Sequence, residues 1–363
     1  MSVLKYAPAV FAVGNEYQIV ILVKESSVMW IKIGDKTFYD HSNGVLRSSS
    51  DVHKITVPAH LLNKEMKYTV CYRKMIERKP YFSETGDVEE IDFYFTMIPE
   101  DRVTLYQIAD AHGMVKQSIA AAKVFEEKYG QINILVLNGD VIDHSGDVKN
   151  FEAIYAIAEG ITAGACPIIF SRGNHDTRGI YAEIFENYTP TRYGKSYFDF
   201  ELPGFYGVVL DCGEDKLDSH PEYGNTNCHE HFRREETEYL KNLATTGQFK
   251  EAEDKKKLVI AHVPFSMKFP HPFNIEEDTY KNWCKTLKNC LKPDVMLAGH
   301  THRYAILREN DENDAFGVPC PAVVGSAPNT RERTFAGAGL IFEGKKITAV
   351  FTNENEVTKE LVI

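Results

Sequence analysis

The stretch LVLNGDVIDH, residues 135–144, runs from apolar residues into a cluster of polar ones. Asn138 and Asp140 follow the apolar residues almost directly, and Asp143 and His144 come next. An unpaired carboxylate at the end of a buried strand is costly, because burial removes its charge from water. The stretch therefore predicts a strand that ends in a site, provided that residues elsewhere in the chain compensate the charge.

The composition is that of a globular protein with an acidic charge balance. The 363 residues suffice for a sizeable core and roughly two or three domains. A net charge of −11 disfavours broad binding to nucleic acid or anionic membrane, since both carry phosphates. No apolar run reaches membrane-span length, and the N-terminus lacks a secretory pattern. The seven cysteines are scattered without a C-x-x-C pair, which favours a reduced, cytoplasmic chain.

The pattern of apolar residues changes near Pro99. Residues 1–97 hold short β-branched and aromatic segments separated by turn residues, which predict an all-β sandwich of the immunoglobulin or fibronectin kind. In residues 98–363 strands alternate with helices, so we expect an α/β domain whose sheet is covered by helices on both faces. The C-terminal residues predict a hairpin on the Gly344–Lys345 turn, followed by a last strand.

Five predicted strands of the second region end in oxygen or imidazole side chains. In open α/β sheets the carboxyl ends of the strands form the edge where ligands bind. Each polar residue could be an ordinary turn residue, but together they indicate one site. The residues at these ends are Asp110 and His112, then Asp140, then Asn174, His175 and Asp176, then His262, and finally His300 and His302.

Mixed carboxylate, amide and imidazole donors suit Mn, Fe, Zn or Mg better than soft thiolate chemistry would. These donors are too many for one ion. Two divalent metals about 3.5–4 Å apart, sharing one carboxylate, would use them all. The sequence thus predicts two metal ions as cofactors. It does not indicate an oligomeric state.

The order of these residues resembles the calcineurin-like metallophosphoesterase superfamily. The blocks are D-x-H at 110–112, G-D-x-x-D at 139–143, G-N-H-D at 173–176, His262, and G-H-x-H at 299–302. The resemblance implies two mixed sheets flanked by helices, an αββα sandwich. It also implies one metal on Asp110, His112, Asp140 and His302, and a second on Asp140, Asn174, His262 and His300.

The resemblance further implies hydrolysis of a phosphoester by a hydroxide that bridges the metals. His175 would be the general acid, oriented by Asp176. The N-terminal sandwich resembles that of purple acid phosphatases, but those have glycine where His112 stands and a tyrosine ligand where Asp143 stands. We therefore expect the ordinary dimetal site of the superfamily. Asp143 is either a support for a ligand or a turn residue.

Four further residues are candidates for substrate binding. Arg178 follows the G-N-H-D block and could hold a phosphate, although a surface ion pair is the alternative. His220 and Tyr223 belong to a histidine-rich loop, and His271 to a proline-rich loop after the His262 strand. Each of these loops could line the pocket or simply connect two elements.

The main prediction is a metal-dependent phosphatase or phosphodiesterase acting on a small phosphomonoester or phosphodiester. A protein Ser/Thr phosphatase is one alternative, yet those enzymes carry G-D-x-x-D-R-G where this chain reads GDVIDHSG. A DNA nuclease is disfavoured by the negative charge. A non-catalytic binding protein with a retained metal site is the alternative from a different class.

Overall fold

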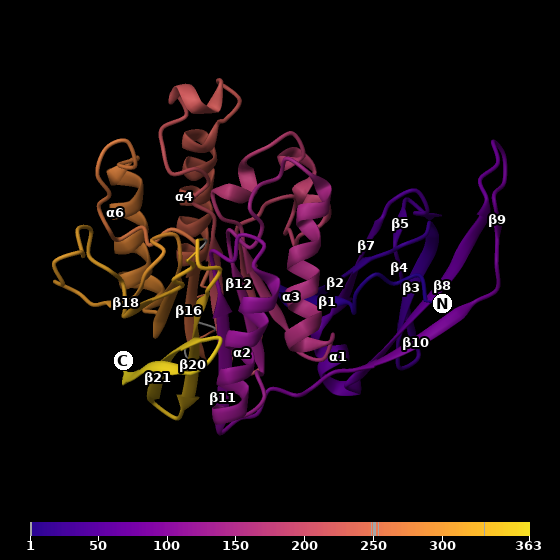
Figure 1. Cartoon of the computed structure of the whole chain (residues 1–363), viewed down its shortest axis with the longest axis horizontal. Helices are drawn as coiled ribbons and strands as arrows, with labels where there is room; N and C mark the ends of the chain where they lie inside the picture. Colours follow the sequence, from indigo (N-terminus) through magenta and orange to yellow (C-terminus); the bar gives the residue numbers. More distant parts are fainter. Residues whose placement is uncertain (1, 248, 250–251, 253, 330) are drawn as a thin grey trace.

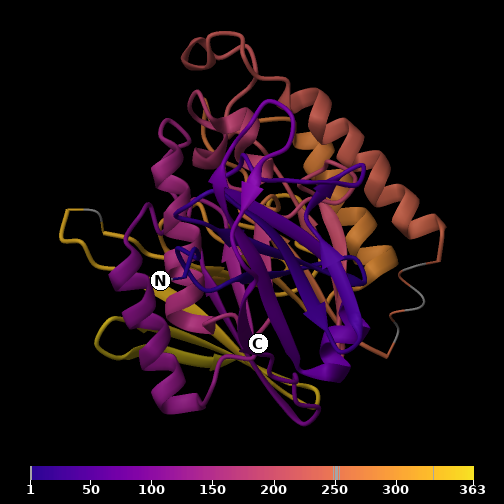
Figure 2. The same cartoon turned by 90° about the vertical axis from the view of Figure 1, so that its right-hand side faces the viewer.

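The computed structural model describes residues 2–247, 249, 252, 254–329 and 331–363. Two large mixed sheets lie face to face at its centre, with helices on both outer sides (Figures 1 and 2). The larger sheet runs in the order β22 (Val357–Val362), β21 (Lys346–Asn353), β20 (Ala336–Glu343), β11 (Arg102–Ile108), β12 (Ile134–Asn138), β13 (Ile168–Ser171), β1 (Ala9–Val13), β2 (Glu16–Leu22) and β7 (Val52–Pro58).

The second sheet has six strands, four of them parallel neighbours. Its inner face packs against the nine-stranded sheet through a shared apolar core that includes Val136 and Ile260. Strands buried on both faces read as continuous apolar runs, as do β12 and residues 258–261 of β16 (Lys256–Ala261). Its order is β14 (Phe198–Leu202), β15 (Phe205–Leu210), β16 (Lys256–Ala261), β17 (Val295–Ala298), β19 (Ala322–Gly325) and β18 (Tyr304–Leu307).

Helices cover the outer faces because each has one apolar stripe. Helix α2 (Val115–Tyr129) turns Ala121, Ala122 and Phe125 to the nine-stranded sheet, beside α3 (Glu152–Thr162). Helices α4 (His229–Thr245) and α6 (Glu277–Thr286) cover the six-stranded sheet, with Trp283 fully buried. The αββα prediction is confirmed, and Figure 2 shows the layers edge-on.

The N-terminal β-rich region is also confirmed, and it is joined closely to the rest. Strands β1, β2 and β7 complete the nine-stranded sheet, with β1 parallel to β13 at Phe11 and Ile168. The boundary between residues 97 and 98 stays a prediction. The other sheet of this region comprises β4 (Lys36–Tyr39), β3 (Ser27–Ile33), β8 (Lys67–Glu77) and β10 (Glu89–Tyr94), and β9 (Glu84–Thr85) pairs with β8. The strands β5 (His41–Ser42) and β6 (Val45–Leu46) form a separate small pair, and the helix α1 (Ala59–Glu65) follows β7.

The predicted C-terminal hairpin is present. Strands β20 and β21 pair across a turn in which Gly344 has a φ of 57°, and β22 follows as the edge strand. The hairpin pairs antiparallel with β11, which leads into the candidate site. Within the described residues, no helix is long and apolar enough to cross a membrane.

Candidate metal centre

The predicted ligands converge where the two sheets meet. Asp110 and His112 follow β11, Asp140 follows β12, and Asn174 follows β13. From the second sheet, His262 follows β16, and His300 and His302 follow β17. The three ligand-bearing strands of the first sheet are parallel neighbours, as are the two of the second. Their carboxyl ends therefore meet at one edge.

The side chains form three overlapping groups that could each hold a metal ion. Within each group the ligand atoms lie within 4.8 Å of one another. The Nε2 atoms of His112 and His302 face each other at 3.2 Å. The three groups are Asp110, His112 and His302; His112, Asp140 and His175; and Asp140, His262 and His300.

The backbone at this site is held in an unusual conformation. Asp110, His112, Asp140, His300 and His302 all have positive φ, between 43° and 68°. Residues other than glycine seldom adopt this left-handed conformation, and it clusters at functional sites where the surroundings enforce it. Five of the seven predicted ligands are thus aimed by strained strand-end turns.

Asp110 has one occupied and one free carboxylate oxygen. Its Oδ2 accepts hydrogen bonds from the Ser326 hydroxyl and from the His300 backbone N–H, the latter at 2.8 Å. Its Oδ1 has no hydrogen-bond partner among the described residues, although the side chain is fully buried. This oxygen lies 3.4 Å from His302 Nε2. A buried oxygen left free beside imidazole nitrogens is the arrangement a cation would complete.

His262 provides a second test of whether a metal fits. Its Nδ1 lies 2.7 Å from the Asn138 carbonyl, so that nitrogen carries the proton and donates it. Its Nε2 lies 3.1 Å from Asp140 Oδ2. Burial lowers the pKa of His262, but the charges of Asp140 and Asp110 outweigh burial and raise it to about 10. The position between Nε2 and the carboxylates therefore requires a cation, either a proton or a metal ion.

Asp140 is held by a neighbouring backbone group and belongs to two of the three ligand groups. Its Oδ1 accepts a hydrogen bond from the His175 N–H at 2.8 Å, while Oδ2 faces His262. Asp176 lies beneath this turn and accepts from the N–H groups of Gly173 at 2.7 Å and Asp140 at 3.2 Å. Burial and the charge of Asp140 raise the pKa of the Asp176 carboxyl.

The structure gives His175 other partners than the sequence suggested. Its Nδ1 lies 2.8 Å from the Asp143 carbonyl oxygen, and its Nε2 lies 3.2 Å from Arg178 Nη1. The described hydrogen bonds of the Asp176 carboxylate go to backbone N–H groups instead. The Asp143 carbonyl thus takes the orienting position that was expected for Asp176. The Asp143 carboxylate is mostly exposed and lies 3.8 Å from His112 Nδ1.

Arg178 belongs to a half-buried ion-pair network. Its guanidinium pairs with Glu214 through two hydrogen bonds of 2.8 Å, and Nη2 also lies 3.3 Å from Asp215. The Tyr223 hydroxyl bonds to the same two carboxylates at 3.0 and 3.2 Å. Tyr223 therefore supports the Arg178 ion pairs, because its hydroxyl donates to the carboxylates that pair with Arg178. A bidentate pair of this kind fixes the guanidinium plane beside His175.

The two remaining substrate candidates lie elsewhere. The His220 ring lies beside the Tyr223 ring, with centroids 5.8 Å apart and planes tilted by 58°, and His220 caps a short helical turn at residues 221–223. His271 is an exposed loop residue. Neither residue belongs to the lining of the cavity above the ligand cluster, whereas Phe269 and Phe273 of the same proline-rich loop do.

Two glycines allow the close packing of the cluster. A Cβ atom on Gly139 would lie 2.6 Å from the His262 ring, and Gly139 itself has a φ of 75°. A Cβ atom on Gly173 would lie 2.2 Å from Asp140 Oδ1. Both distances are too short for real contacts, so the turns at these two blocks require glycine.

Several supporting residues were not predicted from the sequence. Ser326 holds Asp110, and Glu214 holds Arg178. Gln107 links the two sheets beneath the site, because its Nε2 donates to the Ala298 carbonyl at 2.8 Å and its Oε1 accepts from Asn138 at 3.1 Å. A polar residue inside an otherwise apolar strand, as in YQIAD, is the signal that could have pointed to Gln107.

Comparison with known proteins identifies the class. The model of the calcineurin-like phosphoesterase family matches residues 103–304, more than half of the chain, and the chain belongs to this family. This confirms the family that the sequence-based prediction named.

Two individual proteins show where the similarity lies. A probable cyclic nucleotide phosphodiesterase of Fibrobacter succinogenes is 29% identical over 123 residues, 31% of this chain and 46% of that protein. The chain thus matches about half the length of that relative. The structure of a purple acid phosphatase from yellow lupin (Lupinus luteus) seeds superimposes with a TM-score of 0.60 and 11% identity, over 99% of this chain and 75% of that one. This likeness confirms the fold over 99% of the chain.

Proposed function

We propose that the chain hydrolyses a small phosphoester with two divalent metal ions, Mn, Fe, Zn or Mg, and with His175 as the general acid. The observation that carries the proposal is the strained cluster of ligands around the free oxygen of Asp110. One ion would be held by Asp110, His112, Asp140 and His302, and the other by Asp140, Asn174, His262 and His300.

The chemistry divides between these ions and the side chains around them. Bound there, the two ions would supply a hydroxide nucleophile and neutralise charge on the phosphoryl oxygens. The new P–O bond forms to the nucleophile, and the P–O bond to the leaving group breaks. His175 gives its Nε2 proton to the departing oxygen, while its Nδ1–H stays on the Asp143 carbonyl and keeps the ring in place.

Arg178 marks the place of a substrate oxygen. Its Nη1 lies 3.2 Å from His175 Nε2, and both atoms are donors when the imidazole is protonated. A substrate oxygen that lies beside the pair, within hydrogen-bond distance of each nitrogen, accepts from both. Glu214 and Tyr223 hold Arg178 for this contact and do not touch substrate themselves.

A hydrolysis panel on the full chain tests the proposal. The protein is stripped of metal, reloaded with each of the four metals, and assayed on p-nitrophenyl phosphate, bis-p-nitrophenyl phosphate, a phosphopeptide and a cyclic nucleotide. The cyclic nucleotide is included because of the name of the Fibrobacter relative. Metal-dependent turnover of an ester supports the proposal. Two bound metals without turnover of any ester contradict it.

Two variants test the roles of single residues. Asp140→Asn should abolish turnover and the binding of two metals, whereas Asp35→Asn, the same change on an exposed turn, should not. His175→Asn should retain both metals and lose about 10²–10⁴-fold in kcat, the size of a lost general acid. Full activity of the His175 variant would refute that assignment.

A further inference from the structure

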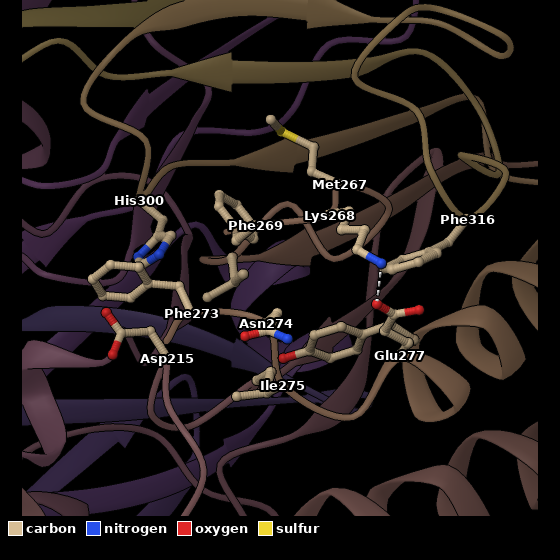
Figure 3. Close-up of a pocket in the computed structure, with 12 residues that line it drawn as sticks. Asp215, Met267, Lys268, Phe269, Phe273, Asn274, Ile275, Glu277, His300 and Phe316 are labelled. Carbon is tan, nitrogen blue, oxygen red and sulfur yellow. Dashed lines mark ion pairs between the residues drawn. The ribbon is translucent and has the colours of Figure 1, made fainter. Parts of the chain in front are cut away.

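Aromatic side chains that solvent can reach line the pocket beside His300 and also one face of the N-terminal region. In the pocket, Phe269 and Phe273 lie next to His300, and Lys268 pairs with Glu277 at 2.6 Å (Figure 3). That pocket adjoins the candidate metal centre and belongs to the proposed active site. The other face is the outer side of the sheet formed by β4, β3, β8 and β10, here called the outer sheet face. The proposed hydrolysis does not use it.

The outer sheet face is the side of this sheet that points away from the core. Side chains alternate along a strand, and Ile31 of β3 and Val70 of β8 point into the core. Their neighbours along each strand therefore point outward. Figure 1 shows these strands at the end of the molecule away from α4 and α6, and Figure 2 looks onto that end. Two rows of outward side chains cross the four strands: Tyr39, Trp30, Cys71 and Glu90, and then Thr37, Lys32, Thr69 and Asp92.

Trp30 and Tyr39 form a shallow aromatic surface on this face. Their ring centroids are 6.3 Å apart, and the ring planes are tilted by 35°. Tyr39 is 51% exposed, and Trp30 is half-buried. The second tryptophan of the chain, Trp283, is fully buried and donates its indole N–H to Thr237 at 2.8 Å. Trp30 is therefore the tryptophan that a ligand in solution can reach.

The polar atoms of these rings are not used within the protein. Among the described residues, no hydrogen bond is made by Trp30 Nε1, by the Tyr39 hydroxyl or by the hydroxyl of Tyr94. Tyr94 lies on the same face, opposite Lys67, and is 70% exposed. Tryptophan and tyrosine combine an apolar ring with a polar tip. They therefore suit a partner that offers both C–H groups and hydroxyls.

The charges on the outer sheet face cancel one another. Lys32 pairs with Glu90 at 2.6 Å, and Lys67 pairs with Asp92 at 2.8 Å. All four side chains are between 44 and 47% exposed, so a ligand can reach them. Two lysines beside two carboxylates give no net charge with which an acidic or basic partner could pair. The face thus complements an uncharged partner, while its paired groups keep free hydrogen-bonding positions.

We propose that the outer sheet face binds a neutral oligosaccharide, with Trp30 and Tyr39 stacking on its sugar rings. A pyranose ring has an apolar face of C–H groups and a rim of hydroxyls. The C–H face matches the aromatic rings, and the hydroxyls match the ion pairs beside them. A broad sheet face suits a chain of sugars that crosses several strands. This inference does not depend on the proposed hydrolysis, and the bound glycan would tether the chain with the metal centre left free.

Fluorescence titration of the full chain tests the proposal. The probes are cellohexaose, maltohexaose, mannohexaose and chitohexaose, which are all uncharged. A sugar that stacks on Trp30 should change the emission until the site is saturated, whereas the buried Trp283 contributes a constant background. Tyr39→Ala keeps the Trp30 reporter and should raise Kd about tenfold, the size of one lost ring contact.

Matched variants separate recognition from folding. Tyr39→Phe keeps the ring and loses only the hydroxyl, so its Kd should lie between those of the wild-type chain and Tyr39→Ala. Tyr81→Ala removes a ring that is 89% exposed in the loop between β8 and β9, and its Kd should equal that of the wild-type chain. Trp30→Ala removes the reporter, so it is titrated by calorimetry, and its affinity should also fall about tenfold or more.

Three results would overturn the inference. No saturable change in emission with any of the four oligosaccharides removes the proposed ligand. An unchanged Kd in both Tyr39→Ala and Trp30→Ala means that the sugar binds elsewhere. A wild-type dimer in sedimentation velocity that dissociates in Tyr39→Ala means that a second copy of the chain covers this face instead.

Discussion

Replacing Gly173 by alanine should disable the metal centre while leaving the fold in place. Gly173 does not have a positive φ, so alanine is compatible with the backbone and the effect comes from the added Cβ atom alone. That atom would lie 2.2 Å from Asp140 Oδ1 and 2.4 Å from the Asp140 backbone nitrogen. Ordinary contacts begin at 3.4 Å, so the Asp140 carboxylate must move by about 1 Å.

The expected loss follows from that displacement. A misplacement of about 1 Å in a catalytic group can lower the rate about 10²-fold, and Asp140 is the ligand shared by both proposed metals. Overpacking should destabilise the fold by about 1–3 kcal/mol. The assay combines kcat/KM, calorimetric metal titration and the unfolding midpoint in urea. Gly86→Ala is the matched control, because its Cβ would meet its nearest atom only at 3.9 Å. Wild-type turnover with two tightly bound metals in Gly173→Ala would refute the placement of Asp140.

Three further predictions concern residues around the site. Ser326→Ala removes the hydroxyl donor to Asp110 and should weaken metal affinity about 10–100-fold in calorimetric titration; unchanged affinity would count against that support. Arg178→Ala leaves the buried Glu214 carboxylate without its cation and should lower the free energy of unfolding in urea by about 3–5 kcal/mol, whereas a change near zero would contradict the ion-pair account. Burial raises the pKa of the Glu236 carboxyl well above its ordinary 4.5, so the stability of the fold should decline as pH rises above 4.5. The decline in melting temperature should be smaller in Glu236→Gln, because the glutamine side chain stays neutral. Equal declines in the two proteins would refute this.

The convergence of the candidate ligands was predictable because it depends on local sequence. Each ligand follows a short apolar run, and runs of this kind fold as buried parallel strands whose carboxyl ends share one edge. The family blocks add the order in which the strands come. The assignment of each ligand to a particular metal stays a prediction, as do the roles of His175 and Arg178.

The supporting contacts could not be read from local sequence. Ser326 lies 216 residues from Asp110, and Glu214 lies 36 residues from Arg178. The orienting partner of His175 was expected next to it in the chain, at Asp176, whereas the structure supplies the backbone carbonyl of Asp143. A carbonyl oxygen belongs to every residue, so no side-chain motif marks it.

The sequence by itself determined the donor types, their positions at strand ends and the layered α/β architecture, because apolar periodicity and strand ends are local properties of the chain. Only the tertiary structure decided which carboxylate oxygen of Asp110 stays free. It also decided that β1, β2 and β7 join the nine-stranded sheet. The physical reason is that these features depend on side-chain directions and hydrogen bonds between segments far apart in sequence, and folding alone brings those segments together.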